Sequence, residues 1–248
     1  MNQKTKDFIE RYIDLIEENE FDELYHIDDE ISTPDLTEAL LSAGIYPLEH
    51  LDYVPSSYHC CSEDVTTVVL PKHIKRISTS AFWDCPNLTS VVLPEGLKHI
   101  GSSAFAECLK LASISFPESL EEIKADAFAQ TNVVHVKIPD LITDVPKYCF
   151  EECPSLEVVE LGACVINLHT GCFARCTKLH TVKINEGLER IYDFAFKECK
   201  NLKKIYLPET VQSIGENAFY NMYPIIQCKE NSYAHKFALS MNYEYELI

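Results

Sequence analysis

The sequence predicts an α/β solenoid of seven stacked repeats, preceded by a small α-helical region. Three observations lead to this prediction. One motif recurs between residues 68 and 222, its phenylalanine returns every 22 or 23 residues, and a second apolar column has the same period. A period of this length is typical of a solenoid, because one unit cannot bury its own apolar face and must stack on its neighbours. Any binding site is therefore expected on a surface of the stack.

The repeated motif reads approximately (V/I)x(L/I/F)PxxLxxIxxxAFxxCxxLxx, and two of its apolar positions are filled in all seven copies. We expect both columns to line one continuous core. The phenylalanine column consists of Phe82, Phe105, Phe128, Phe150, Phe173, Phe196 and Phe219. The second column consists of Ile77, Ile100, Ile123, Val145, Leu168, Ile191 and Ile214.

Each repeat is expected to open with a short strand that ends at a proline, because proline lacks the N–H needed to continue a ladder. Gly162 and Asn185 replace this proline in two repeats, and both residue types favour turns. The AFxxC segment that follows is expected to form a single helical turn. The prolines at the strand ends are Pro71, Pro94, Pro117, Pro139 and Pro208.

The two ends of the chain lack the repeat. Residues 1–66 are predicted to be an acidic helical region and N-terminal cap, with helices over about 5–19 and 33–44 and irregular structure over 45–66. Residues 67–248 are predicted to be the solenoid, closed by a C-terminal cap over 223–248. In that cap a last strand is expected at Ile225 and Ile226, and Ser232 is expected to cap a short helix.

The charge is concentrated at one end of the chain. The formal net charge is −18, of which residues 1–66 carry −14 and residues 67–248 carry −4. Direct nucleic-acid binding needs a basic face, so none is expected. The first residues include Asp7, Glu10 and Arg11 where a secretion signal would be apolar, and no run of 18 apolar residues occurs. We therefore expect a cytoplasmic protein that does not enter a membrane.

The eleven cysteines are predicted to be free thiols. Most occupy repeat columns in which cysteine acts as a small buried hydrophobe, and a reducing cytosol keeps such thiols unpaired. Cys149 and Cys172 fall in a column that is otherwise alanine. The larger cysteine column consists of Cys85, Cys108, Cys153, Cys176 and Cys199.

Motifs for catalysis are not found. The chain has seven glycines and no phosphate-binding loop, GxSxG elbow or HExxH sequence. His59, Cys60 and Cys61, with His50 nearby, form the most zinc-like group, but adjacent cysteines chelate one ion poorly. The sequence therefore predicts a protein that is not an enzyme and has no cofactor and no metal site.

The repeats resemble the BspA-like leucine-rich repeats over about residues 65–248. Seven copies of LPxxLxxIxxxAFxxCxxL in register and the tail SYAHKFALSMNYEYE carry this resemblance. The resemblance implies a right-handed solenoid with parallel strands on its concave face. It also implies a binding protein, and many members of the family are displayed on cell surfaces.

Partner-binding residues are expected at the strand positions that point away from the core, because side chains alternate along a strand. The N-terminal half of this face is small and apolar, whereas the C-terminal half presents lysines and a tyrosine, which suits an acidic or extended protein partner. The predicted contact residues are Val92, Ser115, His135, Lys137, Glu160, Lys183, Lys204 and Tyr206.

Two functions are compatible with this interpretation. The first is a non-enzymatic scaffold that binds another protein on its concave face. The alternative is an inhibitor or nucleic-acid mimic that acts through the acidic residues 1–66, with the solenoid as its support. The identity of the partner and the oligomeric state remain open.

Overall fold

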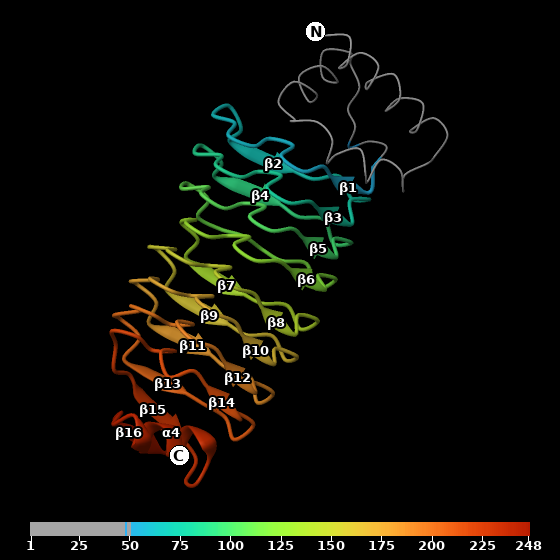
Figure 1. Ribbon diagram of the computed structural model, residues 1–248. Coiled ribbons are helices and arrows are strands. Elements are labelled where there is room, and N and C mark those ends of the chain that lie inside the picture. Colours follow the sequence, from blue (N-terminus) through green and yellow to red (C-terminus); the bar gives the residue numbers. More distant parts are fainter. Residues whose placement is uncertain (1–47, 49–50) are drawn as a thin grey trace.

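The computed structural model describes residues 48 and 51–248, which form an elongated stack of chain turns (Figure 1). The predicted solenoid with parallel strands is confirmed. Two ladders of short parallel strands run side by side along the stack. The predicted helices over 5–19 and 33–44 lie outside the described residues. The described part is mostly strand and turn, with one helix at its C-terminal end.

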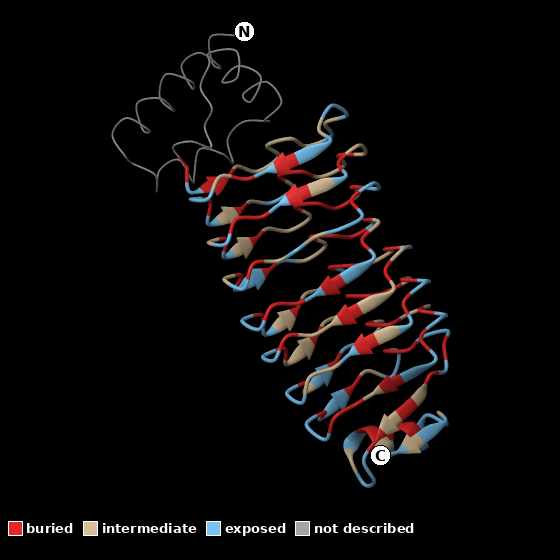
Figure 2. Cartoon of the chain, turned by 180° about the vertical axis from the view of Figure 1, so that it is seen from behind, coloured by how far each residue is buried: buried red, intermediate tan, exposed pale blue. Residues whose placement is uncertain are grey.

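The first ladder contains the strands predicted at the start of the repeats. Strands of adjacent repeats pair in parallel in most of this ladder, as in Val182↔Val159. The central residue of each three-residue strand is buried and its two neighbours point outward. Figure 2 shows this alternation along the stack. The strands are β2 (Thr67–Val69), β4 (Ser90–Val92), β7 (His135–Lys137), β9 (Val158–Glu160), β11 (Thr181–Lys183) and β13 (Lys204–Tyr206).

The second ladder is built on the second apolar column. That column was expected only to line the core, but each of its members ends a two-residue strand that pairs with a neighbouring turn, as in Leu168↔Ile191. The strands are β1 (Tyr53–Val54), β3 (Arg76–Ile77), β5 (His99–Ile100), β6 (Glu122–Ile123), β8 (Asp144–Val145), β10 (Asn167–Leu168), β12 (Arg190–Ile191) and β14 (Ser213–Ile214).

The prediction of a helical turn at the AFxxC segment is wrong. The segment is a hydrogen-bonded turn bounded by left-handed residues, as at Ser80 (φ 54°) and Asp84 (φ 50°), which cannot continue a right-handed helix. Its N–H groups instead reach the following repeat, as from Phe82 to the Ala104 carbonyl at 2.8 Å. Successive turns are thus joined by a third line of backbone hydrogen bonds besides the two ladders.

The phenylalanine column forms the stacked core that the sequence predicts. All seven rings are at most 1% exposed. Neighbouring ring centroids lie 5.2–5.8 Å apart with interplanar angles of 5–16°. Each ring therefore packs against the rings above and below it.

The cysteine column is buried and unpaired, as predicted, but the thiols also make hydrogen bonds. The Cys176 Sγ donates to the Phe150 carbonyl at 3.0 Å, and Cys199 makes the same contact with Phe173. Thr131 occupies this column in a shorter repeat, and its hydroxyl donates to the Phe128 carbonyl. Burial raises the pKa of the Cys176 thiol, which keeps the donating proton in place.

Replacing Cys176 with alanine is expected to lower the free energy of unfolding by about 1 kcal/mol, because the Phe150 carbonyl would lose its thiol donor. Chemical denaturation with circular dichroism measures this change. Cys164→Ala is the matched control, since Cys164 is exposed and lies outside the column. Equal effects of the two substitutions would show that the hydrogen bond contributes nothing.

A turn of the stack lies before the first of the seven repeats. Residues 45–66 were expected to be irregular, but Tyr53 and Val54 pair with β3, and the His59 N–H donates to the Ala81 carbonyl at 2.7 Å. His59 takes the place of the phenylalanine, with its ring centroid 5.9 Å from that of Phe82. An additional, degenerate turn therefore precedes the seven repeats. The division of the chain at residue 66 stays a prediction.

The C-terminal end is closed as expected. Strand β15 (Ile225–Cys228) extends the first ladder beyond β13, helix α4 (Tyr233–Ser240) follows, and β16 (Tyr245–Leu247) pairs with β15. Ser232 caps α4 by accepting a hydrogen bond from the His235 N–H at 3.1 Å. Phe237 is buried 6.4 Å from Phe219, so the helix covers the last ring of the stack.

Both ladders are interrupted between the third and fourth repeats (Figure 1), and the first ladder is also interrupted between β11 and β13. In the first ladder residues 113–115 were expected to form a strand, but they contribute only the bridge from Ser90 to Ser113. In the second ladder β6 and β8 do not pair. The third repeat is also the shortened one, with 22 residues between Phe128 and Phe150.

Candidate functional site

The candidate site is the outward face of the first ladder, formed by the first and third residues of its strands and called here the first-ladder face. Seven of the eight predicted contact residues lie on its strands. Ser115 is exposed but belongs to no strand, because the ladder is interrupted there. The other seven residues flank the buried central residues of their strands; Glu160 and Tyr206 are half-buried and the remaining five are exposed.

The N-terminal half of this face is small and apolar. Val69 is 70% exposed and Val92 is 52% exposed, and they are paired neighbours on β2 and β4. Thr67 and Ser90 form the adjacent pair in the same two strands. The prediction about this half of the face therefore agrees with the structure.

The lysines of the C-terminal half are not an open basic surface. Lys183 Nζ lies 2.7 Å from the Glu160 carboxylate one turn away, and His135 approaches the same carboxylate at 3.3 Å. Lys137 Nζ lies 3.0 Å from Glu118. The hydrogen bond from Lys183 lowers the pKa of Glu160, so this carboxylate is ionised at neutral pH. The acidic partner expected from the sequence would therefore have to compete with carboxylates of the chain itself.

The same pairing continues at the C-terminal end of the face. Lys204 is paired with Glu246 of β16, and the Tyr206 hydroxyl donates to Glu186 at 2.9 Å. Burial and this hydrogen bond raise the pKa of Tyr206 to about 12, so the phenol stays neutral. Glu118, Glu186 and Glu246 were not predicted, because they come from neighbouring loops and from the cap rather than from the strand columns.

The group with zinc-like spacing does not form a metal site in the described residues. His59 packs on Phe82 in the core stack, and burial lowers the pKa of its imidazole. Cys60 and Cys61 lie with their Sγ atoms 3.3 Å apart. His50 lies outside the described residues, and within them no three His, Cys, Asp or Glu side chains gather around a common point.

Comparison with known proteins agrees with this repeat geometry. A family model of the BspA-type leucine-rich repeat region, in six copies, matches residues 52–180 and 100–226. The chain belongs to the BspA-type leucine-rich repeat family. The match begins at residue 52, within the degenerate first turn. Among curated proteins no match to this chain is found.

Solved structures give the same fold. A leucine-rich repeat protein from Bacteroides ovatus is 26% identical with a TM-score of 0.65, and the alignment covers 73% of this chain and 53% of that one. The T. pallidum leucine-rich repeat protein is 25% identical with a TM-score of 0.55, and 78% of each chain is covered. This BspA-type chain thus spans about half of the Bacteroides structure that it matches. No helix in its described part is long and apolar enough to cross a membrane.

Proposed function

We propose that this BspA-type solenoid is a non-enzymatic scaffold that binds another protein on its first-ladder face. The observation that supports the proposal is a contrast within the chain itself. The buried phenylalanine column keeps one residue type in all seven repeats, whereas the third position of the strands holds Val, Val, Lys, Glu, Lys and Tyr in the six strands of the first ladder. Stacking constrains the buried column, and the outward strand position is free to suit a partner.

The charges on this face point to the character of the partner. Each strand lysine already has a carboxylate neighbour, so a strongly acidic partner would have to displace these contacts. A partner surface that carries charges of both signs can instead form ion pairs with these lysines and with their carboxylates. An apolar patch on the same partner can cover Val69 and Val92. Binding by a rigid sheet also costs little conformational entropy on this side of the interface.

A triple substitution tests the proposed face. Lys137→Ala, Lys183→Ala and Tyr206→Ala together should weaken partner binding more than about 30-fold, because tyrosine is a frequent hot spot and truncating one member of an interfacial charge pair weakens binding. The fold should persist, since exposed ion pairs contribute about 0–1 kcal/mol each. The measurement compares proteins crosslinked to each bait in source-cell lysate, followed by the affinity of the identified partner.

The matched control removes two lysines and a tyrosine elsewhere. Lys110, Lys178 and Tyr223 are exposed and lie outside the first-ladder face. A partner kept by this control and lost by the triple variant supports the proposal. If both variants still bind the partner, the binding site lies outside the first-ladder face.

The alternative function, an inhibitor or nucleic-acid mimic acting through the acidic residues 1–66, stays a prediction, because residues 1–47 lie outside the described part. Deleting residues 1–31 separates the two: partner binding that survives the deletion speaks against mimicry. We propose in addition that the protein is cytoplasmic and binds neither nucleic acid nor a membrane directly.

A further inference from the structure

The second ladder contains a groove where β6 and β8 fail to pair. The cause is Pro146. In six other turns the residue after the two-residue strand donates its N–H to the preceding turn, as His169 does to Val145 at 3.0 Å and Lys124 to Ile100 at 2.9 Å. Pro146 has no N–H to give to the Ile123 carbonyl. The ladder opens at this point into a groove of about 790 Å³.

The opening leaves main-chain groups without partners on both walls. Within the described residues, the carbonyls of Glu121 and Ile123 accept no hydrogen bond, although their equivalents in neighbouring turns do. On the opposite wall, the N–H groups of Thr143 and Asp144 likewise have no protein acceptor among those residues. One wall thus offers two acceptors and the other offers two donors. Main-chain groups that face an open groove are hydrogen-bonded by water, so a ligand bound here has to replace those hydrogen bonds.

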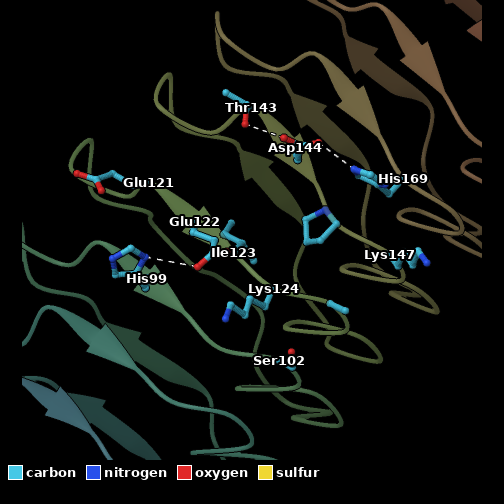
Figure 3. Close-up of a pocket in the computed structure, with 12 residues that line it drawn as sticks. His99, Ser102, Glu121, Glu122, Ile123, Lys124, Thr143, Asp144, Lys147 and His169 are labelled. Carbon is cyan, nitrogen blue, oxygen red and sulfur yellow. Dashed lines mark hydrogen bonds and ion pairs between the residues drawn. The ribbon is translucent and has the colours of Figure 1, made fainter. Parts of the chain in front are cut away.

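Each wall also carries a histidine beside a carboxylate (Figure 3). His99 Nδ1 lies 3.5 Å from Glu122 on one wall, and His169 Nε2 lies 2.8 Å from Asp144 on the other. Burial raises the pKa of Asp144, but the hydrogen bonds from Thr143, His169 and Asn167 lower it by more, so the carboxylate remains an acceptor.

The charge around the groove is balanced. Glu121 is paired with Lys98 at 2.9 Å, and the other two carboxylates face imidazoles. Lys124 and Lys147 line the groove, and within the described chain neither has a carboxylate partner. Three carboxylates and three lysines therefore nearly cancel, which disfavours a ligand with a strong charge of either sign.

An inserted peptide strand does not fit this opening. A strand lies about 4.8 Å from each neighbour, so β6 and β8 would have to be about 9.6 Å apart to admit one between them. Their Cα atoms still approach within 8 Å. The space therefore suits a ligand in which one polar atom forms hydrogen bonds to both walls.

We propose that this groove binds a neutral saccharide unit. A hydroxyl group both donates and accepts, so one sugar hydroxyl bridges a carbonyl of the β6 wall and an N–H of the β8 wall. Several hydroxyls at fixed spacing satisfy the unpaired groups together, with Lys124 and Glu122 as further partners at the rim. The volume lies in the range of small-molecule sites, about 300–1,000 Å³. This proposal does not depend on protein binding by the first-ladder face.

Saturation-transfer NMR on the full chain with cellotriose, mannotriose and galactotriose at millimolar concentration tests the proposal. Transfer from at least one trisaccharide is expected. In Pro146→Val the restored N–H should bond to the Ile123 carbonyl, close the ladder and abolish the transfer. Lys124→Ala should weaken binding several-fold, and Lys110→Ala, on another surface, should leave it unchanged.

Hydrogen exchange separates closure of the groove from misfolding. In Pro146→Val the new amide at position 146 should be protected from exchange. The melting midpoint of this variant should stay near that of the wild type, because the new hydrogen bond offsets the greater freedom of its unfolded chain. The proposal is overturned by the absence of transfer from all three sugars, or by equal transfer from Pro146→Val. It is also overturned if the tripeptide Gly-Asn-Gly shows transfer and the sugars do not, since the groove would then be a peptide site.

Discussion

Replacing Phe150 with alanine is expected to lower the free energy of unfolding by about 3 to 5 kcal/mol. The ring is fully buried and stacks on Phe128 at 5.5 Å and on Phe173 at 5.8 Å. Alanine would leave a cavity and break two ring contacts at once. A typical domain is stable by about 5 to 15 kcal/mol, so this one substitution removes a large share.

The position of Phe150 adds a second expectation. Both ladders are interrupted between the third and fourth repeats. At this level the halves are joined by the Phe128–Phe150 ring contact and by turn hydrogen bonds, such as that from the Phe128 N–H to the Cys149 carbonyl at 2.9 Å. Since solenoid stability is a sum of nearest-neighbour contacts, weakening this junction should uncouple the two halves. The variant is then expected to unfold in two steps rather than one.

Phe105→Ala is the matched control for this prediction. Phe105 is equally buried and stacked, but the second ladder is continuous through β3, β5 and β6 on both sides of it. Both variants should be destabilised, and only Phe150→Ala should show separate transitions in calorimetry and in chemical denaturation. A melting midpoint of Phe150→Ala equal to that of the wild type would contradict the stacked core.

The core could be predicted from the sequence because every repeat supplies the same spacing again. Seven phenylalanines at one spacing leave no other way to bury them than by stacking. The early turn was missed because its ring position holds His59 rather than phenylalanine, although counting 23 residues back from Phe82 reaches this position. A single departure from the pattern hid a turn that keeps the backbone geometry of the others.

The charges of the candidate site were predictable only in part. Glu160 and Lys183 are 23 residues apart in one column, so parallel register alone places them side by side. This ion pair was therefore predictable from the sequence. Glu186 and Glu246 reach Tyr206 and Lys204 from a loop and from the cap, whose paths depend on tertiary packing. No spacing rule in the sequence gives those contacts.

The interruption at Pro146 could also have been foreseen in principle. Proline was predicted to end the first-ladder strands, where its missing N–H fits a turn. The same property at residue 146 opens the second ladder, but recognising this requires knowing that the second apolar column forms strands. The groove therefore became visible only in the structure.

Replacing Gly162 with alanine is expected to lower the free energy of unfolding by about 1 to 3 kcal/mol, because the site has no room for one more carbon. Gly162 is buried in the position that holds proline in five repeats. A Cβ there would lie 2.6 Å from the carbonyl carbon of Pro139 and 2.7 Å from the Ile138 oxygen, both of them main-chain atoms of the preceding turn. Main-chain atoms cannot move aside as a flexible side chain does, so the spacing between two turns must increase.

Gly187→Ala is the control for this substitution. Gly187 belongs to the following repeat and is exposed, and a Cβ there would meet its nearest atom at 3.4 Å. Alanine at this site should leave the free energy of unfolding unchanged or raise it by up to about 1 kcal/mol, by reducing the freedom of the unfolded chain. Chemical denaturation of both variants measures the difference. A Gly162→Ala protein as stable as Gly187→Ala would mean that the turns of this solenoid can separate locally, and the rigid first-ladder face proposed for partner binding would lose its physical basis.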